Sequence, residues 1–172
     1  MKLKEVEAEF SIIKEEEFLL SGKDLVELVQ ETLAKGAGFR FKVKGFSMLP
    51  FIRDGDVVTM SPTSKFPVGF GKSVAFIDSK TNKLVIHRII GKNKGLYLIK
   101  GDNAFGADGL IPKENILGCV TKIERNGKNI FLGLGSERLI IALFSKIRVW
   151  SLVLFFWRML PLFIRNTIKS AI

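Results

Sequence analysis

Ser47 and His87 are the two side chains of this 172-residue chain whose types together suit nucleophilic catalysis. Ser47 lies in the segment Gly45-Phe46-Ser47-Met48-Leu49-Pro50, and the single histidine follows it by forty positions. A serine hydroxyl is a weak nucleophile until a positioned base takes its proton, and imidazole titrates in the range that suits this task. The pair therefore predicts acyl transfer through a serine nucleophile.

A third group must orient the imidazole, and two aspartates could supply it. Asp102 and Asp108 both lie in the turn-rich stretch 100–109, downstream of the histidine. Each also has an ordinary interpretation, as a turn residue whose side chain caps its own backbone. The residue types leave open which of the two contacts His87.

The turn around the serine could also stabilise the negative charge that develops during acyl transfer. A serine between a strand and a Met-Leu-Pro turn is exposed at the end of a rigid element. The backbone N–H groups of Ser47 and Met48 are then free to form an oxyanion hole. Taken alone, this segment is only moderately specific, and an ordinary turn is its default interpretation.

Composition excludes several other kinds of site. With one cysteine and one histidine, the chain cannot form an intramolecular disulfide or a zinc site of the usual spacing, and we expect no metal and no cofactor. Cys119 lies in an apolar run and is expected to be a buried structural thiol. The net charge is +10, but the basic residues are scattered along strands and turns, so no nucleic-acid partner is expected.

The spacing of apolar residues predicts one helix followed by many short strands. Leu25, Val29 and Leu33 lie on one face of a helix that is capped by Ser21 and stops at Gly36. Residues 5–10 could form a short strand. From residue 39 the period changes to two. Strands are predicted at 39–44, 56–60, 72–77, 84–90, 95–99, 116–124 and 129–132, with a tight hairpin at Asn126-Gly127.

This pattern predicts a mainly β fold. It is an antiparallel, partly closed β domain with an N-terminal helix and C-terminal amphipathic helices. We divide the chain into an N-terminal segment and helix (1–38), a catalytic β domain (39–135) and a basic C-terminal helical segment (136–172). Because every candidate catalytic residue lies between 47 and 108, deletion of 137–172 is expected to leave an active, soluble domain.

Residues 137–172 predict a segment that binds an anionic membrane surface. The longest run without a charge, Val149–Trp157, is nine residues, which is short of the ~20 that a spanning helix needs. On a helical wheel Arg148 and Arg158 lie in one stripe beside a broad aromatic and apolar face, as in helices that lie in a membrane interface. The alternatives are a helix that packs on the domain or dimerises, and a tilted span.

Six motifs occur in the order of the sequence boxes of type I signal peptidases. They are Gly-Phe-Ser-Met-Leu-Pro (45–50), Arg-Asp-Gly-Asp-Val-Val (53–58), Gly-Lys-Ser-Val-Ala-Phe (71–76), Val-Ile-His-Arg-Ile-Ile-Gly (85–91), Tyr-Leu-Ile-Lys-Gly-Asp-Asn (97–103) and Ile-Pro-Lys-Glu-Asn-Ile-Leu-Gly (111–118). From residue 39 to about residue 125 the chain resembles this family, which shares a clan with the self-cleaving SOS repressors. Position 87 has histidine, which resembles the endoplasmic-reticulum and archaeal members of the family. Most bacterial members have lysine at this position.

The resemblance implies a role for each candidate side chain. Ser47 would be the nucleophile and His87 the general base and later acid. Asp108 would orient the histidine, and Asp102 would be a supporting acid in the same loop.

The resemblance also implies how a substrate is held. The fold would be an antiparallel β domain that binds the substrate as an added strand, with Val43, Lys44 and Gly45 forming one wall of the cleft. Many members carry a serine where this chain has Gly45, so the oxyanion hole would rest on the backbone of Ser47 and Met48.

These observations predict a membrane-associated, signal peptidase-like serine endopeptidase that cleaves a leader or precursor peptide through an acyl-enzyme. Residues 1–20 hold nine charges and no long apolar stretch, so neither a signal peptide nor the family's usual anchor is expected, and the location would be the cytoplasmic face of the inner membrane.

One alternative is a self-processing protein, because Ala37-Gly38 resembles the bond that such repressors cut, although it lies only nine residues before Ser47. The other is a non-catalytic scaffold that binds peptides or membranes. The oligomeric state is not predicted.

Overall fold

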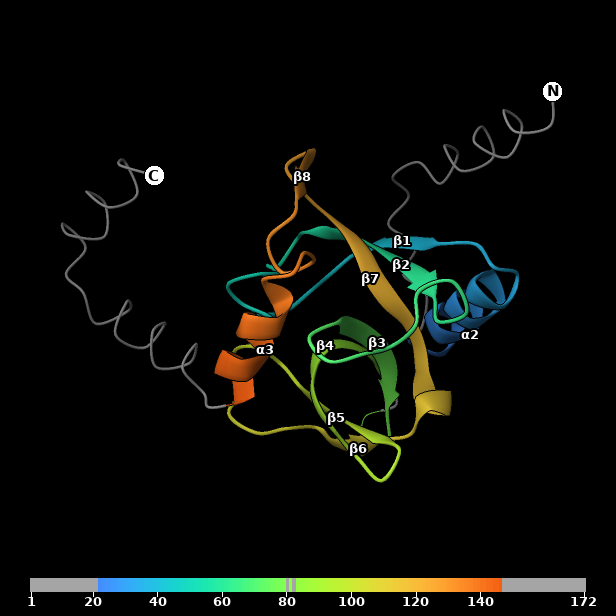
Figure 1. Cartoon of the computed structure of the whole chain (residues 1–172). Coiled ribbons are helices and arrows are strands. Elements are labelled where there is room, and N and C mark those ends of the chain that lie inside the picture. The colour runs from blue at the N-terminus through green and yellow to red at the C-terminus, as the bar shows by residue number, and fades with distance from the viewer. Residues whose placement is uncertain (1–21, 80, 82, 147–172) are drawn as a thin grey trace.

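The computed structural model describes residues 22–79, 81 and 83–146. In this part of the chain eight strands form one antiparallel sheet, in the order β1-β2-β7-β3-β4-β5-β6 with β8 paired to β7. The strands are β1 (Phe39–Lys42), β2 (Val57–Pro62), β3 (Ser73–Asp78), β4 (Lys83–Asn93), β5 (Leu96–Lys100), β6 (Gly109–Ile111), β7 (Ile116–Arg125) and β8 (Lys128–Ile130). The sheet curls on itself (Figure 1), which confirms the prediction of a mainly β, antiparallel, partly closed domain.

Alternating side chains explain why β1 forms where it does. Phe39 is buried, whereas Arg40 and Lys42 are exposed, so the strand has one face on the core and one in solvent. The register shifts within three strand pairs, at Thr59/Met60, Ala75/Phe76 and Ile89/Gly91. Such irregularities bend a sheet and help it to curl.

Two short elements show where the sequence pattern was informative and where it was not. Asn126 and Gly127 have φ of 49° and 75°, the left-handed conformation that a two-residue hairpin needs at both positions, so the predicted hairpin is confirmed. Strand β6 was not predicted. It has three residues and begins at Gly109, where φ is 116°, and so short a segment shows no periodicity.

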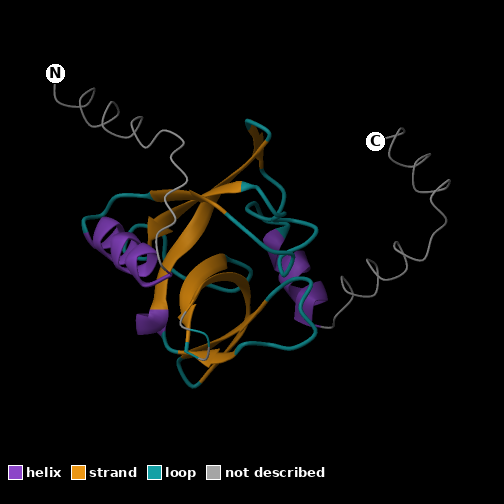
Figure 2. Ribbon diagram, turned by 180° about the vertical axis from the view of Figure 1, so that it is seen from behind, coloured by secondary structure: helices purple, strands orange, loops and turns teal. Residues whose placement is uncertain are grey.

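Helix α2 (Gly22–Ala34) covers one side of the sheet. Its buried Val29 and Leu33 share a core cluster with Phe39, Met60 and Ala75. The helix ends before Gly36, as predicted, and the N–H of Gly36 donates to the carbonyl of Leu33. The predicted cap at Ser21 and the short strand at 5–10 lie outside the described residues. The two α-helices of the described part lie on opposite sides of the curled sheet (Figure 2).

The second of these, α3 (Arg138–Lys146), is part of the folded body. Its Ile141, Ala142 and Ser145 are buried, and the helix contacts β4. A deletion that begins at residue 137 would remove these buried side chains, so a truncation that spares the domain has to begin after Lys146. The amphipathic helices predicted beyond that residue lie outside the described residues. Within the described ranges, none of the helices combines the length and the apolar character that crossing a membrane requires.

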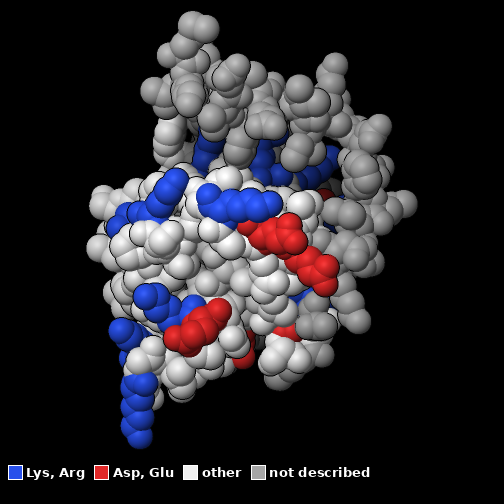
Figure 3. Space-filling model, turned by 90° about the vertical axis from the view of Figure 1, so that its right-hand side faces the viewer, with Lys and Arg blue, Asp and Glu red and all other residues white. Residues whose placement is uncertain are grey.

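Charged side chains are dispersed over the face of the molecule that Figure 3 shows. Basic and acidic side chains both occur there, and some adjoin one another amid uncharged surface. Among the ion pairs of the described residues, Glu124 lies 2.9 Å from Arg40 and 3.2 Å from Lys122. In this view the excess positive charge of the chain therefore does not form one continuous basic field.

A buried carboxylate fixes the turn that follows the serine segment. Asp56 is 2% exposed and accepts hydrogen bonds from the side chain of Arg125 and from the backbone N–H of Arg53, each at 2.8 Å. Burial alone would raise the pKa of Asp56. The hydrogen bonds from Arg125 and Arg53, together with the positive charges of both arginines, nevertheless hold it below its ordinary value.

This depressed pKa predicts a pH-dependent contribution to stability. Because the pKa of Asp56 is lower in the folded than in the unfolded protein, the ionised carboxylate stabilises the fold above its unfolded pKa, and this contribution is lost as the pH falls through the folded value. Asp56→Asn should lower the free energy of unfolding by about 3 kcal/mol near pH 7, and by progressively less below about pH 4. Urea unfolding of wild type and Asp56→Asn at a series of pH values measures the difference between their free energies of unfolding. A difference that stays constant into the acid range would contradict the prediction.

Candidate active site

Ser47, His87 and Asp108 form one continuous chain of hydrogen bonds. The Ser47 hydroxyl oxygen lies 2.9 Å from Nε2 of His87, and Nδ1 of His87 lies 2.7 Å from a carboxylate oxygen of Asp108. An ionised carboxylate can only accept a hydrogen bond, so Nδ1 carries the proton and Nε2 presents its lone pair to the serine hydroxyl. This arrangement can remove a proton from the serine.

Three separate elements supply these side chains. Ser47 lies in the turn after β1 and is exposed, His87 lies on β4 and is 7% exposed, and Asp108 lies in the loop before β6. The hydroxyl can therefore be reached from solvent, while the ring that would act as its base is held within the fold.

The loop 101–108 is tied directly to the serine turn. The backbone N–H of Asn103 donates to the carbonyl of Ser47 at 2.7 Å, and its side-chain amide donates to the carbonyl of Phe46 at 3.1 Å. On the other side of the serine, Met48 is buried and packs in a core cluster with Ile52. Asn103 was not among the predicted site residues, because these contacts cross more than fifty positions of sequence.

The backbone near the serine offers unused donors. The N–H groups of Ser47 and Met48 donate no hydrogen bond to any other described residue. Preorganised N–H groups of this kind can hold an oxygen that gains negative charge in a transition state. The oxyanion hole at these two residues stays a prediction.

Asp102 has different partners from Asp108. It is fully buried, and its carboxylate accepts hydrogen bonds from Nε and a terminal nitrogen of Arg88, at 2.8–3.1 Å, and from the hydroxyl of Ser145 on α3. Arg88 also donates to the carbonyls of Gly71 and Gly133 at 2.7 and 3.1 Å. Asp102 therefore joins the loop 101–108, β4 and α3 in one buried cluster, and Asp108 is the carboxylate that contacts His87.

Gly101 lies where a side chain would separate the serine turn from the histidine. A Cβ added to Gly101 would lie 2.7 Å from the carbonyl oxygen of Ser47 and 3.0 Å from Nε2 of His87. Both distances are shorter than ordinary contacts to a methyl group. The absence of a side chain here lets the loop approach close enough for Asn103 and Asp108 to make their contacts.

Gly101→Ala should therefore disrupt the site geometry. Displacement of a reacting group by about 1 Å can cost 10²-fold in rate, so we expect a loss of about that size in kcat for a cleavable peptide. Gly106→Ala is the matched control, because it lies in the same loop and a Cβ there has no neighbour within 4 Å. Equal activity of the two variants would show that the close approach at Gly101 is not required.

The strand that precedes the serine has an open edge in the described part of the chain. Strand β1 stands at one end of the sheet order. The N–H of Val43 donates to the carbonyl of Asp56 at 2.8 Å, and its carbonyl accepts from Gly55 at 3.0 Å, so its polar backbone groups face the β2 side. Since these groups alternate along an antiparallel strand, those of Lys42 and Lys44 face the open edge.

The backbone of Gly45, the third residue of the predicted wall, has a local partner. Its N–H donates to the side chain of Asp54 at 2.8 Å, and φ at Gly45 is 110°. Among Val43, Lys44 and Gly45, Lys44 is thus the residue whose backbone is best placed to pair with an added strand.

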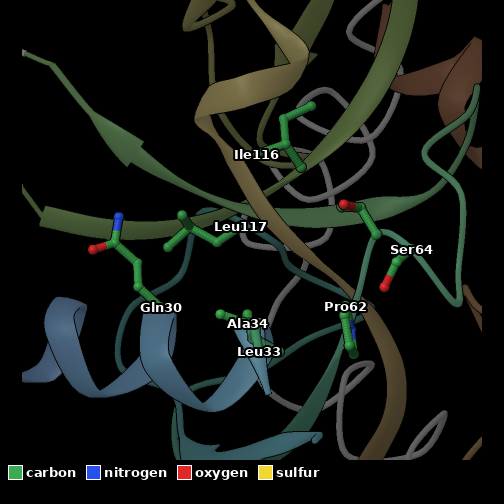
Figure 4. Close-up of a pocket in the computed structure, with 8 residues that line it drawn as sticks. Gln30, Leu33, Ala34, Pro62, Ser64, Ile116 and Leu117 are labelled. Carbon is green, nitrogen blue, oxygen red and sulfur yellow. The ribbon is translucent and has the colours of Figure 1, made fainter. Parts of the chain in front are cut away.

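A separate pocket of about 290 Å³ lies between α2, the end of β2 and the start of β7 (Figure 4). Its lining is uncharged and contains none of the predicted site residues. The lining residues are Gln30, Leu33, Ala34, Pro62, Thr63, Ser64, Ile116 and Leu117. Without an ionisable side chain this pocket cannot supply acid–base chemistry.

Comparison with models of known protein families identifies a match. A family model described as "Peptidase S24-like" matches residues 3–121, well over half of the chain, and the match includes Ser47, His87, Asp102 and Asp108. No match is found among the curated proteins.

Proposed function

The chain belongs to the peptidase S24-like family, and from this premise we propose that it is a serine endopeptidase that acts through an acyl-enzyme intermediate. The observation that carries the proposal is the continuous chain of hydrogen bonds from Ser47 through His87 to Asp108, at 2.9 and 2.7 Å. A nucleophile, a base and a group that orients the base are the parts that such chemistry requires.

Each step of the proposed reaction has a residue to perform it. Oγ of Ser47 attacks the scissile carbonyl carbon while Nε2 of His87 takes the hydroxyl proton, and the N–H groups of Ser47 and Met48 stabilise the oxyanion. The imidazolium returns that proton to the leaving amine as the C–N bond breaks. Water, deprotonated by the same Nε2, then hydrolyses the acyl-enzyme. Asp108 orients the ring and stabilises its positive charge.

We place the substrate as an extended strand between two open strand edges. One is the edge of β1 at Lys42 and Lys44. The other is the first part of β4. Among the strands that the structure describes, residues 83–87 pair with β3 alone, and β5 joins only from Arg88. Half-buried Phe41 of β1 and Ile86 of β4 pack against the same core cluster, which supports a slot between the two strands. Backbone pairing would provide affinity and alternate side chains specificity.

The finer proposal is that the substrate is a leader or precursor peptide. It is supported by the order of the signal peptidase-like motifs and by the histidine at the position of the base. The same resemblance implies small side chains just before the scissile bond.

The geometry disfavours self-cleavage at Ala37-Gly38. Gly38 directly precedes β1, and a Cβ added to it would lie 3.2 Å from the carbonyl oxygen of Met60 on β2. The next residue, Phe39, pairs with Met60, whereas Ser47 follows the opposite end of β1. Strand β1 would have to leave the sheet for this bond to reach the serine hydroxyl.

Covalent labelling of Ser47 distinguishes an enzyme from a non-catalytic scaffold. A peptide that carries a serine-directed phosphonate ester should phosphonylate one residue with loss of its alcohol leaving group, and mass spectrometry of the digest should locate the adduct on Ser47. His87→Ala should abolish labelling because the hydroxyl loses its base. A protein that folds normally and stays unlabelled would rule out the peptidase and leave the scaffold.

We further propose that the enzyme acts at an anionic membrane surface. The support is the basic and apolar sequence after Lys146, together with Leu139, Ile140 and Leu143 of α3, which are about half exposed. The cytoplasmic face as the side of action stays a prediction.

The membrane proposal predicts salt-dependent binding to vesicles. The full chain should sediment with phosphatidylglycerol vesicles, and salt should weaken binding, since each basic residue near such a surface contributes about 1 kcal/mol. A truncation after Lys146 should lose binding but keep cleavage of a short peptide. Arg148→Glu with Arg158→Glu should also release the protein, whereas Lys94→Glu with Lys128→Glu, the same change of charge on the domain, should not. Resistance to alkaline carbonate and protection of the tail from protease would instead show a span.

A further inference from the structure

A second pocket, of about 240 Å³, has neither Ser47 nor His87 in its lining and is not used by the proposed reaction. The loop before β3, strand β7 and the start of α3 form its walls. It is lined by polar and apolar groups that include the side chains of Lys72, Ser73, Cys119, Thr121 and Arg138.

The lining of this pocket is cationic. Lys72 and Arg138 are its two charged residues, and no carboxylate is among the lining residues. The nearest acid in sequence, Glu137, has its carboxylate bonded to the N–H groups of Gly133 and Gly135 at 2.8 and 2.9 Å. The lining residues therefore carry two positive charges and no negative one, and the carboxylate of neighbouring Glu137 interacts with the charge of Arg138 from beside the pocket.

The lysine is held in place at this pocket. Its ammonium group donates to the carbonyl of Pro67 at 2.6 Å. Burial raises the pKa of the Cys119 thiol, and the charge of Lys72 acts in the opposite direction, which shows that the ammonium group lies close to the sulfur. With its pKa raised, the thiol stays neutral near pH 7 and does not balance the lysine.

Arg138 has a buried donor without an acceptor. One terminal nitrogen donates to the carbonyls of Leu134 and Gly135, at 3.2 and 2.9 Å. Its Nε is fully shielded from solvent and has no hydrogen-bond partner among the described residues. Because Nε is shielded from solvent, a molecule in the pocket would contact the rest of the guanidinium group instead. Arginine N–H groups donate most strongly to charged acceptors, so this group is suited to an oxygen of an anion.

We propose that this pocket binds a phosphate group, with Arg138 and Lys72 as its cationic ligands and Ser73 as a further donor. The volume accommodates one such group. The proposal does not depend on the peptidase activity. A phosphate here would bridge the loop before β3 to α3. Because Gly133, which lines the pocket, also accepts a hydrogen bond from Arg88, bound phosphate would steady the helix that contacts Asp102.

The same chemistry has two sources, free phosphate and the headgroup of an anionic phospholipid. Inorganic phosphate tests the pocket itself. Vesicles of phosphatidylcholine with and without phosphatidic acid, added with or without competing inorganic phosphate, test whether the group arrives on a lipid.

The experiment measures phosphate binding to the full chain by calorimetric titration and by thermal unfolding, against sodium chloride at equal ionic strength. Wild type should show saturable binding and a rise in Tm. Arg138→Gln and Lys72→Gln should each weaken binding by about tenfold or more, because each removes a charge-assisted hydrogen bond. Lys128→Gln, which removes an exposed charge of β8 outside the pocket, should bind as wild type does.

Each outcome is decisive. Saturable binding that only the two pocket variants lose supports the site. Loss, in the same variants, of the part of phosphatidic acid binding that inorganic phosphate competes away also supports it and would identify the lipid as the source. Phosphate effects that are equal in all four proteins, that do not saturate, or that sodium chloride reproduces would overturn the proposal. If Arg138→Gln unfolds more easily without phosphate, Lys72→Gln still provides the test.

Discussion

Ser47→Ala and His87→Ala should each lower kcat for a cleavable peptide by about 10⁵- to 10⁶-fold, the scale seen when either member of a comparable catalytic unit is removed. The two side chains are bonded at 2.9 Å and act on the same proton, so their losses should not add. The double variant should be scarcely slower than either single one. Steady-state or single-turnover cleavage of a fluorogenic peptide measures all three.

Two controls make this comparison specific. Ser64→Ala changes an exposed serine far from the loop that carries Asp108, and it should cleave at the wild-type rate. Lys100 is the buried lysine next to that loop, and its ammonium group donates to the carbonyl of Gly101 at 3.1 Å. Near-full activity of His87→Ala together with loss of activity in Lys100→Met would identify a lysine base and overturn the proposed one.

Much of the fold could be predicted because its strands have one buried and one exposed face. Phe39, Arg40 and Lys42 show this alternation directly, and Asn126-Gly127 has the residue types that a tight hairpin demands. Periodicity cannot say what covers an apolar face, however. In α3 the domain itself covers Ile141 and Ala142, whereas the sequence pattern favoured a membrane interface for this segment.

The candidate site was predictable where it depends on residue types and not where it depends on distant partners. Ser47 and His87 could be paired because His87 is the single histidine of the chain and Ser47 lies in a distinctive turn sequence. Asp102 and Asp108 lie in similar turns, and the difference between them comes from Arg88 and Ser145, 14 and 43 positions away from Asp102. The two residues missed, Gly101 and Asn103, act through close approach and backbone contacts, which have no sequence signal of their own.

Asp108→Asn should lower kcat by about 10⁴-fold, by analogy with amidation of the aspartate in a serine–histidine–aspartate triad. An amide can donate to Nδ1, and that favours the tautomer in which Nε2 carries the proton and cannot accept one from Ser47. The side chain of Asp108 is about one quarter exposed, so the fold should tolerate the change. Cleavage rate and thermal unfolding, measured on the same preparation, separate the two effects.

Asp102→Asn should act in the opposite way, mainly on stability. It removes the negative charge that faces Arg88, whose side chain is 1% exposed, and an uncompensated buried charge costs about 3–5 kcal/mol. The free energy of unfolding should fall by roughly that amount, while kcat per folded molecule stays within about tenfold of wild type, because Asp102 does not contact His87. Urea unfolding and titration of active sites with the phosphonate trap give the two quantities. Normal stability with lost activity in Asp102→Asn, and wild-type turnover in Asp108→Asn, would exchange the roles assigned to the two carboxylates.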